Sequence, residues 1–304
     1  MEGCRLCPRR CGVHRERGEL GFCQSPATPH VARAAKHMFE EPCISGTKGS
    51  GTVFFTGCSL GCIFCQNRAI RTPESGRPYD AEALAALFLA LAAQGVHNLN
   101  LVTPTHYADT VARALALARP KLRIPVVWNC GGYESLQTLQ MLSGLVDVYL
   151  PDFKYISPQL AKEYSAAPDY ADHATRALGE MVRQVGAVSF DGEGLLRRGV
   201  MVRHLVLPGG RHDSIAVLDR IAATVAVGEV RLSLMSQYTP DFLPPDAPRT
   251  LSRRVTTFEY EFVKAHAVAL GFEGYFQLRE SASATYTPDF SAPVLPDTDT
   301  KGGA

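Results

Sequence analysis

The sequence lacks an excess of charge of either sign, and it lacks a long apolar run. Lys and Arg total 31 and Asp and Glu total 30 among 304 residues, so the formal net charge is +1. A charge this small gives no long-range attraction to nucleic acid or to anionic lipid. The longest apolar run, residues 83–93, is far shorter than the roughly 20 residues that span a bilayer. We therefore expect a protein that binds neither nucleic acid nor membranes.

The first residues, MEGCRLCPRRCG, contain no apolar segment of the kind found in secretory signals. This favours a cytoplasmic enzyme, and a hydrophobic content of 46% is enough for a substantial buried core. Because the cytosol keeps thiols reduced, clustered cysteines in such a protein are more often metal ligands or catalytic groups than disulfides.

Seven of the nine cysteines fall in two clusters, unlike cysteines scattered through a core. The first cluster is Cys4, Cys7, Cys11 and Cys23, and the second is Cys58, Cys62 and Cys65. Four thiolates in the first cluster are enough for a zinc site or for an iron–sulfur cluster. We expect residues 1–35 to form a small Cys-rich metal-binding segment, with the choice between these metals left open.

From residue 52 onward, short apolar segments alternate with segments of helical periodicity. The expected strands are residues 52–57, 98–103, 124–130, 145–150, 199–207 and 229–235. The expected helices are residues 81–94, 108–118, 135–143, 215–225 and 251–270. Apolar strands that alternate with helices are typical of a parallel sheet covered by helices. We expect an α/β fold, a partial (β/α)6 barrel over residues 36–290, and a disordered tail at 291–304.

The second cysteine cluster ends the first expected strand with the spacing C-x3-C-x2-C. Three thiolates suit an iron–sulfur cluster with one open coordination position, whereas most such clusters take four protein ligands. Cys43 or Cys130 would close the site as a fourth ligand, and a zinc loop is the other alternative. Polar residues also end the other expected strands, and parallel barrels carry their reactive groups at these ends. We therefore expect one site there.

The segment Cys58-Ser-Leu-Gly-Cys62-Ile-Phe-Cys65 resembles the cluster loop of the radical S-adenosylmethionine (radical SAM) superfamily. Gln66-Asn67 strengthens the likeness to the pyruvate formate-lyase activating enzyme branch. Over residues 4–290 the chain is similar to an uncharacterised family of paralogues of that enzyme. The segments that carry this likeness are CRLCPRRCGVHR, HMFEEPCISGTKGSGTVFF, VTPTHY, VDVYLPDFKY and SLMSQYTP.

The resemblance implies a [4Fe–4S] cluster on Cys58, Cys62 and Cys65, whose fourth iron binds SAM. It further implies one-electron reduction of SAM to methionine and a 5′-deoxyadenosyl radical that abstracts a hydrogen atom, with a flavodoxin or ferredoxin-type protein as electron donor. The acceptor would be the glycine of a glycyl radical enzyme, another peptide or a small metabolite. The alternative from another class is an iron–sulfur or zinc scaffold, or an electron-transfer protein without SAM chemistry.

The resemblance also assigns contacts with the cofactor. Phe64 is expected to contact adenine, and Gln237 is expected to contact the ribose. Asp152 is expected to bind a cation. Lys154 is expected to bind the SAM carboxylate, and Arg203 is expected to lie near the carboxylate of SAM or of the substrate.

Two segments depart from the pattern of the activating enzymes. Where that branch has Gly-Gly-Glu to bind the SAM amino group, this chain has Val-Thr-Pro-Thr-His at residues 102–106. We expect Thr103 and Thr105 to replace this contact and His106 to pair with substrate. The third expected strand ends in Asn129-Cys130-Gly131-Gly132 in place of Asp-Thr-Asn-Gly. Loss of that carboxylate weakens the expectation of a cation site.

Overall fold

The computed structural model describes residues 3–277 and residue 290. Its sheet has ten strands, nine of them in the order β10-β9-β8-β6-β5-β4-β2-β1-β3, while β7 pairs with β8 alone. Six neighbouring strands at the centre run parallel and confirm the expected α/β fold. They are β2 (Ser50–Phe55), β4 (Asn98–Val102), β5 (Val126–Cys130), β6 (Val148–Pro151), β8 (Leu196–Leu205) and β9 (Val230–Met235).

Four further strands were not expected from the sequence. β1 (His30–His37) pairs antiparallel with β2, and β3 (Arg77–Pro78) pairs with β1. At the other edge, β10 (Gly274–Phe276) runs parallel to β9, while β7 (Ser189–Phe190) forms a hairpin with β8. The boundary that we expected after residue 35 falls inside β1. The expected tail, residues 291–304, lies outside the described residues.

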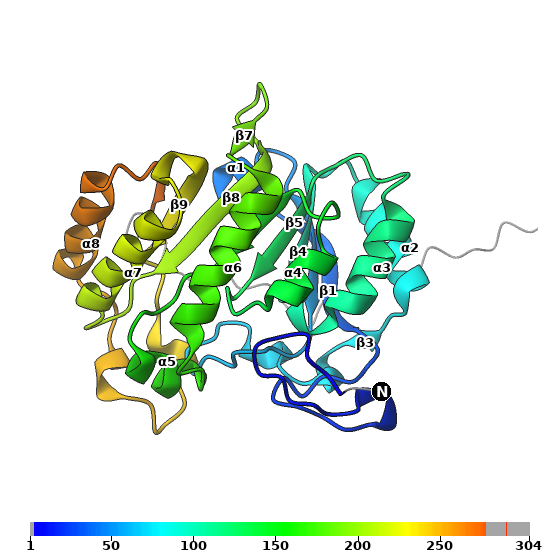
Figure 1. Ribbon diagram of the computed structural model, residues 1–304, viewed down its shortest axis with the longest axis horizontal. Helices are drawn as coiled ribbons and strands as arrows, with labels where there is room; N and C mark the ends of the chain where they lie inside the picture. Colours follow the sequence, from blue (N-terminus) through cyan, green and yellow to red (C-terminus); the bar gives the residue numbers. More distant parts are fainter. Residues whose placement is uncertain (1–2, 278–289, 291–304) are drawn as a thin grey trace, which may run out of the picture.

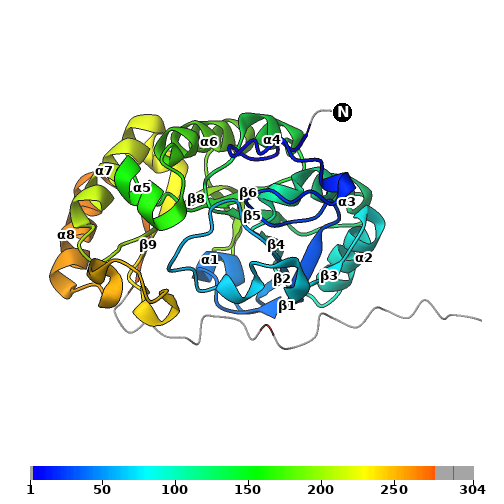
Figure 2. The ribbon, with the colours of Figure 1, turned by 90° about the horizontal axis from the view of Figure 1, so that it is seen from below.

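All helices except α1 lie outside the curved sheet (Figures 1 and 2). The five expected helices are α2 (Ala81–Ala92), α3 (Ala108–Ala118), α4 (Leu136–Met141), α7 (Arg211–Thr224) and α8 (Thr257–Ala269). The unexpected ones are α1 (Pro42–Ser45), α5 (Pro158–Ser165) and α6 (Tyr170–Val185). Short 3-10 turns lie at Arg15–Arg17, Arg68–Ile70, Pro73–Ser75, Thr105–Tyr107, Val227–Glu229, Pro240–Phe242 and Arg249–Ser252. None of the described helices is long and apolar enough to cross a membrane.

The two faces of the sheet have different cores. Successive strand residues point to opposite faces, so Trp128 packs outward into the main apolar core while Val127 packs into a smaller cluster on the inner face. That smaller cluster contains Cys43 and Ile44 of α1, and Figure 2 shows α1 inside the arc of strands. Asn98 of β4 donates to the Ile44 carbonyl at 2.7 Å. The helix α1 therefore fills part of the inner face and leaves the strands' carboxyl ends for a site.

Candidate cofactor site

The three-cysteine loop (residues 57–67) leaves β2 through two glycines with left-handed backbone. Gly57 has a φ of +81°, and a Cβ there would lie 2.1 Å from Ser25 Oγ. Gly61 has a φ of +65°, and its Cβ would lie 2.4 Å from an Arg71 nitrogen. The backbone angle favours glycine at both positions, and at Gly57 the Cys23 carbonyl oxygen, 2.8 Å from the Cβ position, also leaves no space for a side chain. The glycines therefore fix a tight loop that carries the three thiols.

The surroundings of the three thiols suit ligands that bind metal as thiolates. Leu60 N–H donates to Cys58 Sγ at 3.4 Å, and Ser165 Oγ donates to Cys62 Sγ at 3.0 Å. Burial, and then the charges of Cys62 and Cys58, raise the pKa of Cys65 to about 12. The thiols are thus close enough to disfavour one another's ionisation, and iron bound to all three would offset that repulsion.

Residues from four separate segments line a cavity of about 210 Å³ beside this loop, the first cavity. Cys62, Cys65 and Phe64 reach it from the loop, and Gln237 follows β9. The cavity is also lined by Asp152 and Lys154 after β6 and by Arg203 on β8. Sequence reasoning therefore named five of the non-cysteine residues that meet here. The resemblance to the activating enzymes assigned all five residues to one site, and the structure places them together, while their contacts with SAM stay predictions.

A buried ionic network forms one wall of the first cavity. Asp152 accepts from Lys154 Nζ at 2.6 Å and from Arg203 Nε at 2.9 Å. Burial alone would raise the pKa of Asp152, but the charges of Arg203 and Lys154 outweigh it and lower that pKa. Arg203 also donates to Asn129 Oδ1 at 2.6 Å. Because both Asp152 oxygens already accept from protein cations, the expected role of Asp152 as a cation ligand is not supported.

Phe64 has little exposed surface, 8%, yet it lines the first cavity. Its ring packs edge-on against Tyr164 and Tyr238, with centroid distances of 6.3 and 6.0 Å. This arrangement fixes the ring plane at the cavity wall, where it can contact a flat aromatic group.

The sequence pattern of the Radical SAM superfamily matches residues 52–193, a stretch that contains all three cysteines of the loop together with Asp152 and Lys154. Residues 52–193 carry a radical SAM domain. Such a domain implies a [4Fe–4S] cluster and SAM as cofactors. An uncharacterized protein of Methanocaldococcus jannaschii is 28% identical over 271 residues, which cover 86% of this chain and 73% of that protein.

Two solved structures show a more distant likeness. SuiB of Streptococcus suis is 15% identical with a TM-score of 0.46, over 72% of this chain and 46% of SuiB. Methylornithine synthase (PylB) is 15% identical with a TM-score of 0.46, over 80% of this chain and 74% of PylB. This chain therefore matches less than half the length of SuiB.

The radical SAM domain does not bring Thr103, Thr105 and His106 to the first cavity. Thr105 is 2% exposed and donates its hydroxyl to Glu134 Oε1 at 2.7 Å. His106 is 1% exposed, and its Nε2 lies 2.7 Å from the Thr56 carbonyl oxygen. Thr103 lies in the left-handed region, with a φ of 57°, and donates its N–H to the Asn129 carbonyl. Thr105 and His106 thus make their side-chain hydrogen bonds within the core, and none of the three residues lines the first cavity.

The contact between Thr105 and Glu134 yields a prediction for stability. Burial raises the pKa of Glu134 from an ordinary 4.5 to about 7. The folded state therefore holds this proton more tightly, so its stabilising effect is complete below pH 4.5 and is lost as the pH rises through 7. Glu134→Gln removes the charge and should raise the free energy of unfolding at pH 8 by about 1–3 kcal/mol. Urea unfolding at pH 5 and pH 8 tests this: equal effects at both would contradict it.

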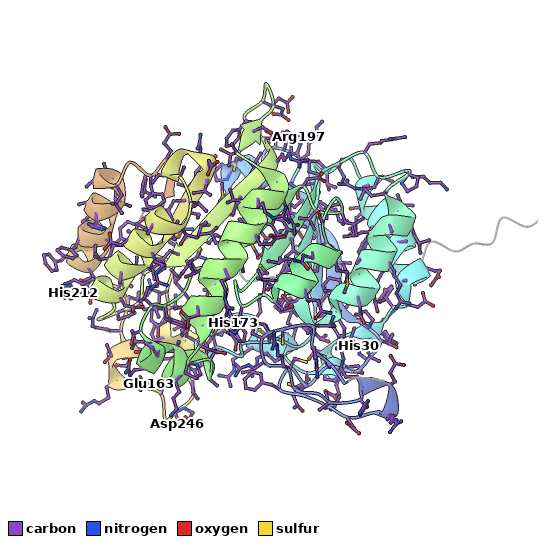
Figure 3. All side chains as sticks on the ribbon, viewed as in Figure 1. His30, Glu163, His173, Arg197, His212 and Asp246 are labelled. Carbon is purple, nitrogen blue, oxygen red and sulfur yellow. The ribbon has the colours of Figure 1, made fainter. Side chains whose placement is uncertain are left out.

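The Cys-rich N-terminal segment packs directly on the radical SAM domain, beside the carboxyl ends of the strands (Figure 1). Arg9 donates from Nε to the Ser59 carbonyl and from Nη2 to the Ser165 carbonyl, both at 2.9 Å, and its Nη1 bonds the Ala166 carbonyl. Its guanidinium also lies 5.4 Å from the Tyr133 ring centroid. His173 on α6, labelled in Figure 3, packs edge-on against the same ring. No sequence pattern predicts this role of Arg9.

All four cysteines of the N-terminal segment line one small cavity. Burial raises the pKa of Cys7 to about 12, and the charges of Cys23, Cys4 and Cys11 contribute to the rise. Within residues 3–277 and 290, no three Cys, His, Asp or Glu side chains form a group that could hold one metal ion. In a [4Fe–4S] cluster each thiolate binds its own iron, so this finding concerns a single ion and not a cluster.

Proposed function

We propose that this protein is a radical SAM enzyme whose [4Fe–4S] cluster is held by Cys58, Cys62 and Cys65. The observation that carries the proposal is that Cys62 and Cys65 of the three-cysteine loop line the first cavity together with the ionic wall of Lys154, Asp152 and Arg203. When bound, the cluster and SAM supply one-electron cleavage of SAM and a 5′-deoxyadenosyl radical that abstracts a hydrogen atom. The protein's part is to bind, orient and shield these groups.

Each wall of the first cavity suits one part of SAM. Lys154 is raised in pKa because the charges of Asp152 and Cys62 outweigh its burial, so it stays cationic and suits the SAM carboxylate. Phe64 offers a ring face or edge to adenine, and the Gln237 amide can both donate to and accept from ribose hydroxyls. Arg203 holds Asp152 in place at 2.9 Å and thereby positions Lys154.

The hydrogen-atom donor is proposed from the sequence likeness. Gln66-Asn67 after the last cysteine of the loop favours an activase that acts on the glycine of a glycyl radical enzyme, and both residues line the first cavity. A peptide or a small metabolite is the second candidate, because the Gly-Gly-Glu segment of the activases is replaced by Thr103-Pro104-Thr105. In either case we propose a flavodoxin or ferredoxin-type protein as electron donor.

The function is tested with anaerobically reconstituted protein, dithionite and SAM. We expect slow release of 5′-deoxyadenosine without any added substrate, measured by chromatography. If protein with a full cluster released no 5′-deoxyadenosine, the proposed enzyme function would be contradicted. A scaffold or an electron-transfer protein would then be the better interpretation. A glycyl radical signal after addition of a glycyl radical enzyme would then separate an activase from an enzyme that modifies another substrate.

We also propose a second metal centre on Cys4, Cys7, Cys11 and Cys23. Its metal is tested with the triple variant Cys58→Ala/Cys62→Ala/Cys65→Ala, which retains only the N-terminal set. Elemental analysis is expected to find metal bound to this variant. Further replacement of Cys7 and Cys23 by Ala should abolish this metal binding. Iron with sulfide would identify an auxiliary cluster, zinc would identify a structural ion, and a metal-free triple variant would contradict the second centre.

A further inference from the structure

A second cavity of about 460 Å³ adjoins the first on the inner face of the sheet. Its lining includes the end of β1 and the start of α1 on one side and β10, an edge strand of the sheet, on the other. Five residues line both cavities: Gln66, Asn67, Arg203, Met235 and Gln237. Among the described residues, no cysteine lines the second cavity, whereas Cys62 and Cys65 line the first. The second cavity is therefore a separate compartment that opens toward the cofactor.

The second cavity is acidic because Glu40 and Glu41 line it. Glu40 Oε1 accepts from Asn100 Nδ2 at 2.8 Å, and its Oε2 lies 3.7 Å from Arg203 Nη1. Arg203 makes its shorter ion pair, 2.9 Å, with Asp152, which Lys154 also contacts. Three carboxylates thus face two cations across the shared wall. When Glu40 is ionised, this leaves one negative charge in excess; because burial raises the pKa of Glu40 to about 7, the excess develops as the pH rises through 7.

Two buried polar atoms at this cavity have no partner among the described residues: Glu41 Oε2 and Ser233 Oγ. Ser233 is 0% exposed, and it pairs with Arg203 in the register of β8 and β9, so both side chains lie on the inner face. A buried acceptor without a hydrogen bond costs free energy, so such groups are normally paired. These two atoms stand where a bound molecule would satisfy them.

We propose that the second cavity binds a protonated amine of the substrate, held by Glu41 and Ser233 with Glu40 behind them. An ammonium has three donors and carries the charge that the acidic wall lacks, whereas a carboxylate or phosphate would be repelled. Phe54, Tyr275 and Phe276 line the same cavity and provide apolar surface for the carbon chain that carries the amine. The inference rests on the proposed function, since SAM is assigned to the first cavity, and it adds the chemical class of the substrate.

The amine comes either from a free metabolite or from a lysine side chain of a peptide, and calorimetry distinguishes these sources. The probes are 1,5-diaminopentane, its isostere 1,5-pentanediol, and the peptide acetyl-Gly-Lys-Gly-amide, each titrated into oxidised reconstituted protein with SAM present. We expect an amine probe to bind at least tenfold more tightly than the diol. Tighter binding of the diamine would indicate a metabolite, and tighter binding of the peptide would indicate a lysine side chain.

Variants link this binding to the named residues. Glu41→Gln should weaken binding of the preferred amine at least tenfold, and Ser233→Ala should weaken it several-fold. Glu163 lies on the surface of α5 (Figure 3), so the control variant Glu163→Gln should leave the affinity for the amine unchanged. Equal affinity for amine and diol, no binding of either amine, or displacement of the amine by SAM would overturn the proposal. Because no reductant is present, the result is independent of 5′-deoxyadenosine release.

Discussion

Replacement of Cys62 by Ala is expected to lower 5′-deoxyadenosine release by at least a hundredfold. Cys62 lines the first cavity and lies between the other two thiols in the loop, so its loss removes one of only three protein ligands of the cluster. A site with two thiolates cannot retain a cluster that already leaves one iron without a protein ligand. The measurement is 5′-deoxyadenosine released per chain under dithionite, together with iron content.

Cys43→Ala is the matched control for this experiment. Cys43 is buried, as Cys62 is, but it packs in the apolar cluster around α1. It does not line the first cavity and is not part of the three-cysteine loop. This variant should retain both iron and activity. If Cys62→Ala retained release, or if Cys43→Ala lost it with the fold intact, the assignment of the three ligands would be wrong.

Arg203→Met should lower the free energy of unfolding by about 3–5 kcal/mol, because it leaves buried carboxylates without their shared cation. Arg203 contacts Asp152 at 2.9 Å and Glu40 at 3.7 Å, and its side chain is only 16% exposed. Methionine keeps much of the volume, so the loss reports charge more than packing. The urea midpoint measures this, with an unchanged slope as the sign that the folded state stays compact.

Arg183→Met provides the comparison for this prediction. Arg183 pairs with Glu180 one turn away on α6, and its side chain is 66% exposed. An exposed pair is screened by solvent and contributes little, so this variant should unfold at an unchanged urea concentration. Equal effects of the two substitutions would show that the network around Asp152 is not held as the structure describes.

The sequence predicted the central part of the fold because the parallel strands are buried on both faces and read as apolar runs. β4, β5, β6, β8 and β9 were each found in this way. β1 was not predicted because its sequence, HVARAAKH, places charged residues among small ones. It also lies near the edge of the sheet, beside β3. β10 has three residues and cannot be recognised locally. The central strands could thus be predicted from the sequence. The strands near the edges of the sheet could not, because they form through tertiary contacts.

The same distinction holds for the site. Phe64, Lys154 and Arg203 were assigned through the resemblance to the activating enzymes, and all three line the first cavity, while their contacts with SAM stay predictions. Thr105 was wrongly assigned because its direction depends on the left-handed residue Thr103 before it, which the sequence does not reveal. Glu40 was missed because the segment FEEPCISG is turn-rich, and nothing local shows that it folds back to contact Asn100 and Arg203.

The most direct test of the account is the electron paramagnetic resonance spectrum of the reduced protein before and after addition of SAM. If Cys58, Cys62 and Cys65 hold a [4Fe–4S] cluster with one open iron beside the first cavity, SAM should change the g values of the reduced cluster. Lys154→Met should raise the SAM concentration needed for this change about tenfold or more, because the carboxylate loses a charged partner. A spectrum of the three-cysteine cluster that SAM leaves unchanged would contradict the account.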